Sequence, residues 1–118
     1  PGDRHMEVAK RGCGYVVHLS DGPKVSGHRP SVDILFASVA REAGGYGIGV
    51  LLTGMGRDGA SELKTLRDAG GRTVVQDQTT SVVWGMPMEA DRIGAAEQVL
   101  PIDKIGAAVQ SYLGDAVE

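Results

Sequence analysis

The spacing of apolar residues changes along the chain and marks out its elements. Two β-prone stretches, 6–10 and 15–19, flank the turn sequence Arg11-Gly12-Cys13-Gly14 and predict an antiparallel hairpin with a four-residue loop. Apolar residues then recur at helical spacing, which predicts a helix over 32–43 that ends at two glycines. The residues on this face are Val32, Leu35, Phe36, Val39, Ala40 and Ala43.

The rest of the chain alternates short strands with helices. The unbroken apolar run 48–52 predicts a strand buried on both faces. Further strands are predicted over 72–76 and 98–100, and helices over 60–69, from Pro87 to Gly94, and from Pro101 onward. The last helix has an apolar face of Ile102, Ile105, Val109, Tyr112 and Leu113. Residues 81–84 fit either a short strand or the approach to a helix. This order predicts an α/β fold, a doubly wound, mainly parallel sheet with a β-hairpin.

Three parallel strands are few for such a sheet, which needs neighbours at its edges. The chain also opens in the turn sequence Pro1-Gly2-Asp3. We therefore expect the sheet to be incomplete at its amino-terminal side, and residues 1–118 to be the carboxyl-terminal portion of a larger domain.

Composition and charge narrow the classes of function. The net charge is −3, which predicts no nucleic-acid partner, and no apolar run is long enough to predict membrane insertion. The single Cys13 excludes an internal disulfide and favours a reducing, cytoplasmic compartment. No spacing of His, Cys or acidic residues indicates a metal site.

Candidate chemistry is concentrated in the glycine-rich segment that follows strand 48–52. Gly54, Gly56 and Gly59 match the G-x-G-x-x-G pattern between a strand and a helix, and Asp77 follows the next strand. A dinucleotide-binding module is therefore one interpretation. Asp58 argues against it, because a carboxylate among the helix amides would repel a pyrophosphate.

Two other interpretations of Asp58 remain open. In the structural one, Asp58 caps the helix that follows it, and the glycines only form the turn of a non-catalytic interaction domain. In the catalytic one, Asp58 orients a histidine for acyl transfer, and the Met55 N–H donates to an oxyanion.

The nucleophile and base of such a triad cannot be found in the chain. No serine lies in a G-x-S-x-G segment. His18 falls in a predicted strand. His28, in a loop beside Arg29, is predicted as a substrate contact, and His5 is interpreted in the same way.

Longer sequence blocks resemble one family, the chemotaxis protein-glutamate methylesterases (CheB), in order along essentially the whole chain. The blocks are Pro1-Gly2-Asp3-Arg4-His5, Leu19-Ser20-Asp21-Gly22-Pro23, His28-Arg29-Pro30-Ser31-Val32-Asp33, Leu52-Thr53-Gly54-Met55-Gly56-Arg57-Asp58-Gly59-Ala60 and Gly85-Met86-Pro87. They resemble the carboxyl-terminal part of the catalytic domain.

The resemblance implies a hydrolase that removes methyl esters from receptor glutamates and deamidates receptor glutamines with a Ser-His-Asp triad and no cofactor or metal. Asp58 would be the triad aspartate and Met55 the backbone donor of the oxyanion hole. Separately from the resemblance, His28, Arg29 and Thr53 are predicted as substrate contacts. The serine and histidine segments would lie before Pro1. The implied partners are methyl-accepting chemotaxis receptors and an upstream receiver domain.

Overall fold

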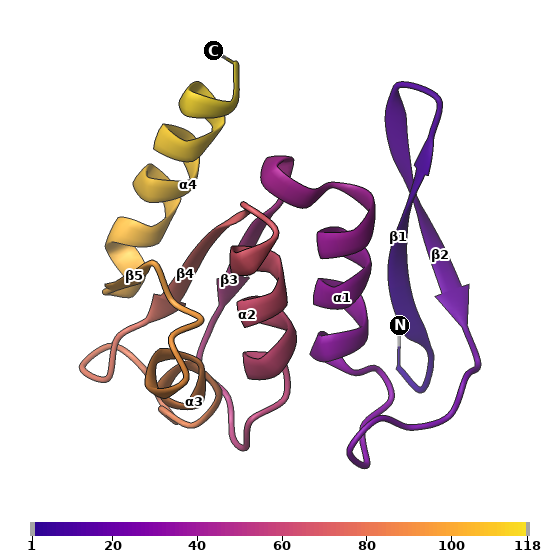
Figure 1. The fold of residues 1–118 in the computed structure, drawn as a ribbon. Coiled ribbons are helices and arrows are strands. Elements are labelled where there is room, and N and C mark those ends of the chain that lie inside the picture. Colours follow the sequence, from indigo (N-terminus) through magenta and orange to yellow (C-terminus); the bar gives the residue numbers. More distant parts are fainter. Residues whose placement is uncertain (1, 118) are drawn as a thin grey trace.

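The computed structural model describes residues 2–117 and has three layers (Figure 1). The central layer is a parallel sheet with strand order β3-β4-β5, and one face of it carries α1, α2 and α3 while the other carries α4. The strands are β3 (Ile48–Leu51), β4 (Arg72–Gln76) and β5 (Gln98–Leu100). The helices are α1 (Val32–Glu42), α2 (Ala60–Asp68), α3 (Met86–Arg92) and α4 (Ile102–Val117), with a short 3-10 turn, η1 (Gly44–Tyr46), after α1. The predicted α/β fold with a parallel sheet and a hairpin is confirmed.

The antiparallel hairpin consists of β1 (His5–Arg11) and β2 (Gly14–Ser20) and packs its first strand against α1. Arg11 pairs with Gly14, so the loop contains two residues and not the four predicted. The hairpin lies outside the three-stranded sheet, on the far side of α1 (Figure 1).

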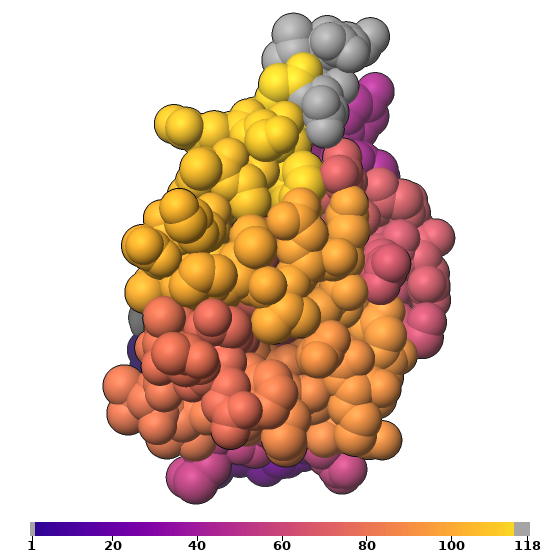
Figure 2. All heavy atoms as spheres, turned by 90° about the vertical axis from the view of Figure 1, so that its left-hand side faces the viewer, coloured from indigo at the N-terminus to yellow at the C-terminus, as the bar shows by residue number. Residues whose placement is uncertain are grey.

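Two apolar clusters hold the layers together. The first lies between the sheet and the α1–α3 face and centres on Phe36, Leu63, Leu66 and Val75. The second lies under α4 and is formed by the buried Val74, Ile105 and Tyr112. Figure 2 shows the face formed by α4 and, below it, the segment between β4 and α4.

Several sequence predictions need correction. Ile102 and Leu113 are about half exposed, so the buried face of α4 is narrower than predicted. Of the two alternatives for residues 81–84, the strand is wrong and the approach to a helix is confirmed, since these residues lead into α3; Trp84 makes a single parallel bridge with Gly54. That bridge ties the loop after β3 to the loop after β4, since Gly54 N–H also donates to the Val83 carbonyl at 2.9 Å.

Candidate active site

Asp58 caps the amino terminus of α1. Its Oδ1 accepts hydrogen bonds from the Ser31 hydroxyl at 2.8 Å and from the Asp33 N–H at 3.1 Å. Its Oδ2 accepts the Val32 N–H at 2.7 Å. The prediction that Asp58 caps the following helix is therefore wrong, because α2 begins after Gly59 as N-cap and α1 receives the carboxylate.

The backbone at Gly59 explains this choice of helix. Gly59 has φ +92°, a left-handed conformation that side chains disfavour, and a Cβ placed there would lie 2.8 Å from Cγ1 of Val32. Because of this turn, the segment that follows β3 passes close to the start of α1. Asp58 meets the α1 amides as a result.

Asp33 in turn caps the amino terminus of α2. Its Oδ1 accepts the Glu62 N–H at 3.0 Å, in the first turn of α2. A pyrophosphate bound by the G-x-G-x-x-G loop would need the amides at this helix end and would meet the Asp33 carboxylate there. The geometry thus argues against the dinucleotide interpretation.

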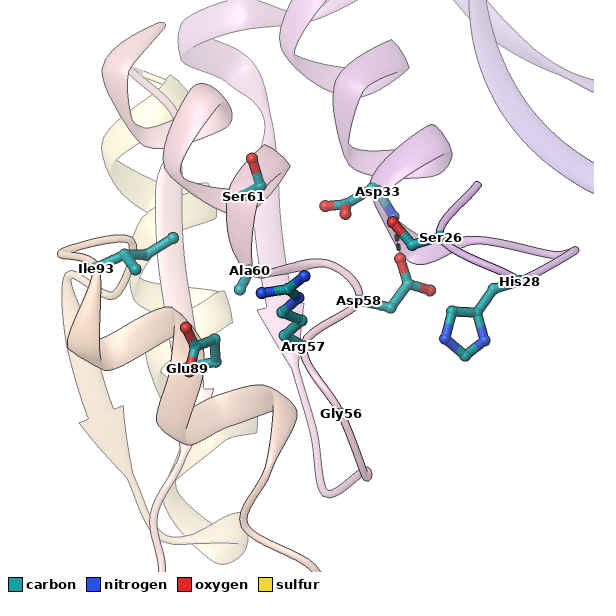
Figure 3. A pocket seen from close by; sticks show the side chains of 10 residues that line it. All are labelled: Ser26, His28, Asp33, Gly56, Arg57, Asp58, Ala60, Ser61, Glu89 and Ile93. Atoms are coloured by element: carbon teal, nitrogen blue, oxygen red, sulfur yellow. Dashed lines mark hydrogen bonds between the residues drawn. The ribbon is translucent and has the colours of Figure 1, made fainter. Parts of the chain in front are cut away.

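Both carboxylates line one cavity of about 610 Å³ (Figure 3). Arg57 extends into it from the loop that carries Asp58, and Glu89 of α3 lines the opposite wall. The hydrogen bond from Arg92 lowers the pKa of Glu89, and the charge of Arg57 acts in the same direction. The cavity is therefore walled by acidic groups with a guanidinium between them.

Of the predicted substrate contacts, His28 lines this cavity together with Asp58. Its backbone exchanges two 2.9 Å hydrogen bonds with Val25, which fixes the loop that carries it. Within residues 2–117, no hydrogen bond joins its ring to Asp58.

The other two predicted contacts are engaged elsewhere. The Arg29 guanidinium donates to Asp3 at 3.0 Å and to the Gly22 carbonyl at 3.3 Å. The Thr53 hydroxyl accepts the Val83 N–H at 2.8 Å and donates to the Val83 carbonyl at 3.0 Å. Neither residue lines the cavity, and their substrate contacts stay predictions.

Met55 lies at the tip of the loop after β3, with its side chain 81% exposed. The carbonyl of the preceding Gly54 accepts the Gly85 and Met86 N–H groups at 3.1 and 2.8 Å, which anchors the loop to the start of α3. Among the described residues the Met55 N–H has no backbone acceptor.

The sequence analysis misplaced His5 and missed Ser31. His5 begins β1 and is only 2% exposed, so its interpretation as a loop contact was wrong. Its Nδ1 accepts the Ser31 N–H at 3.2 Å, which leaves the proton of a neutral ring on Nε2, 2.8 Å from the Pro23 carbonyl oxygen. Ser31 stands directly before the apolar helical pattern, and this N-cap signal could have identified it.

The Asp58 carboxylate lies beyond the carboxyl end of β3, and parallel α/β sheets hold their ligands at this edge. Residues 1–109 match the family model described as CheB methylesterase. The chain belongs to the CheB methylesterase family. In the part of the chain that the structure describes, no helix could span a membrane and no group of three or more acidic, His or Cys side chains could hold a metal ion.

Two curated relatives agree with this family assignment. The chain is 53% identical over 116 residues to "Protein-glutamate methylesterase/protein-glutamine glutaminase 4" of Anaeromyxobacter dehalogenans, covering 98% of this chain and 33% of the relative. It is 55% identical over 109 residues to the protein with the same name and number 2 of Pseudomonas aeruginosa, covering 92% and 31%. The chain thus spans about a third of the length of these curated relatives.

A solved structure shares the fold. The crystal structure of the Thermotoga maritima CheB methylesterase catalytic domain superposes with a TM-score of 0.85 at 34% identity. The match covers 89% of this chain and 56% of that domain.

Proposed function

We propose that the protein containing this chain hydrolyses glutamate methyl esters and deamidates glutamines on chemoreceptors. A Ser-His-Asp triad performs the reaction, and Asp58 is its aspartate. The family and the names of the relatives support the reaction class. The setting of Asp58 supports its role.

The observation that carries this role is the number of donors around Asp58. An ionised carboxylate offers about four acceptor sites. Three are occupied by Ser31, Val32 and Asp33, and these donors hold both oxygen atoms in place. The half-buried Asp58 lines the cavity, so the remaining site can accept an imidazole N–H.

The histidine and the serine come from polypeptide outside residues 1–118. The serine oxygen attacks the ester carbonyl while the histidine removes its proton, and the histidine then protonates the departing methanol. Water hydrolyses the acyl-enzyme by the same route and leaves a glutamate. In deamidation the group that leaves is ammonia. Asp58 fixes the tautomer of the histidine and stabilises the imidazolium in each step.

The Met55 N–H donates to the carbonyl oxygen as negative charge develops on it. The anchoring of Gly54 by Gly85 and Met86 supports this role, because it fixes the loop that presents the amide. His28, Arg29 and Thr53 are the proposed substrate contacts, and chemoreceptors are the proposed partners. The upstream receiver domain implied by the sequence stays a prediction.

The test is Asp58→Asn in the complete protein, with methanol release from methylated receptor as the measurement. We expect turnover to fall by about four orders of magnitude, because the amide holds the histidine in the wrong tautomer. Asp68→Asn is the control, an exposed acid on α2 that pairs with Lys64. Turnover close to that of the unmodified protein would leave Asp58 as a helix cap with no part in the reaction.

Residues 1–118 alone test where the nucleophile lies. We expect this piece to release no methanol from methylated receptor. Turnover by the isolated piece would show that the nucleophile lies within it.

A further inference from the structure

We propose that Ser31 is a positioning residue for Asp58 and that His5 in turn fixes Ser31. This inference rests on the proposed role of Asp58 in the triad. It adds the groups that determine which way the carboxylate faces.

Ser31 holds one oxygen of Asp58 from a buried site. It is 2% exposed, and its hydroxyl donates to Oδ1 of Asp58 at 2.8 Å. Among the residues that the structure describes, the other donor to Oδ1 is the Asp33 N–H, at the longer distance of 3.1 Å. Without the hydroxyl, the carboxylate is held mainly through Oδ2 by Val32 and can turn about its Cβ–Cγ bond. The free acceptor site would then no longer face one fixed direction.

The hydrogen bonding of Ser31 departs from that of an ordinary helix cap. A serine at the N-cap position normally accepts an N–H group of its own helix. Ser31 is the N-cap of α1 but makes no such bond, and it donates to Asp58 instead. If these residues only capped α1, the Ser31 side chain could accept the helix N–H group itself, and Asp58 would not be needed as the acceptor.

His5 fixes the backbone from which this hydroxyl projects. The Ser31 N–H donates to Nδ1 of His5, while Nε2 lies 2.8 Å from the Pro23 carbonyl oxygen. The ring is buried at the start of β1. Ser31 is thus held between the hairpin and the loop that carries Asp58.

The test compares two buried serines in the complete protein, Ser31 at the N-cap of α1 and Ser38 within the helix. Ser31→Ala should lower kcat for methanol release by about 10-fold or more with KM unchanged, because a charge-assisted hydrogen bond is lost at the triad. Ser38→Ala is the matched control. Its hydroxyl accepts the Val8 N–H at 2.9 Å and donates to the Leu35 carbonyl at 2.7 Å, but it does not contact Asp58. We expect this control to lose stability and keep its kcat.

Ser31→Gly provides a second variant should Ser31→Ala fail to fold, because glycine is well tolerated at N-cap positions. It removes the same hydroxyl and should lose kcat to a similar extent. Equal kcat values for the Ser31 and Ser38 variants, with Asp58→Asn inactive, would overturn the inference alone. An active Asp58→Asn would overturn the proposed role of Asp58 in the triad and this inference with it.

Discussion

Asp33 and Asp58 cap each other's helices. Asp58, in the loop that leads into α2, accepts two N–H groups at the start of α1, whereas Asp33, in the first turn of α1, accepts the Glu62 N–H of α2. The two helix starts are therefore fixed to each other at the cavity. The same contacts that stabilise the helices define the position of Asp58.

Asp33→Ala should destabilise the complete protein by about 1 kcal/mol, because the Glu62 N–H loses its acceptor. Urea denaturation followed by circular dichroism measures this loss. Asp68→Ala, which removes only an exposed pair with Lys64, should cost about 0.5 kcal/mol or less. Equal stability of the two variants would show that Asp33 does not act as a cap.

Acid should weaken the attachment of α4 through Glu97. Arg72 donates to this carboxylate at 2.7 Å and lies over the ring of Tyr112 in α4, 4.1 Å from its centre. The hydrogen bond from Arg72 lowers the pKa of Glu97 below its ordinary value of 4.5. The folded state therefore gains stability above pH 4.5 and loses it as the pH falls through the lower folded pKa.

Glu97→Gln should consequently flatten the acid side of a plot of Tm against pH. Glu7→Gln, which removes a longer and more exposed pair with Arg41, is the control and should keep the original slope. An unchanged slope in Glu97→Gln would mean that the Arg72 pair contributes nothing to acid sensitivity.

Gly85→Ala should disturb the loop that carries Met55. A Cβ at Gly85 would lie 2.8 Å from the Gly54 carbonyl oxygen and 3.0 Å from the Gly56 nitrogen, and backbone atoms cannot move aside cheaply. Misplacing this loop should reduce methanol release about 10- to 100-fold.

Gly106→Ala is the matched control for this substitution. Gly106 lies in α4 with nothing within 4 Å of an added Cβ, so alanine should add about 0.5–1 kcal/mol of stability. Turnover should stay unchanged. Undiminished turnover in Gly85→Ala would show that the reaction does not depend on the position of the Met55 loop.

Residues 1–118 expressed alone should be unstable or self-associate. Among the described residues β3 pairs only with β4, which leaves its other edge open. Sedimentation velocity at several concentrations would detect association, and thermal unfolding would measure stability. A monomer that melts cooperatively would contradict this prediction.

The elements could be predicted from the sequence because their signals are local. Strand 72–76 and strand 98–100 agree with β4 and β5 residue for residue, and the helical spacing of Val32 to Ala43 marks α1 to within one residue. The four-residue hairpin loop was wrong because Arg11 and Gly14 can pair across a two-residue turn. His5 was misplaced because its burial depends on α1 and Pro23, not on its neighbours in the chain.

By itself, then, the sequence determined the order and type of the elements and the blocks that mark the family. The spacing of apolar residues and the glycines that end helices and strands are signals within a few residues, so they can be recognised without knowledge of the fold. Only the tertiary structure decided which helix Asp58 caps and which groups hold it. Its partners Ser31, Val32 and Asp33 lie 25 to 27 residues earlier, and they meet it only because α1 and α2 pack side by side and the chain turns at Gly59.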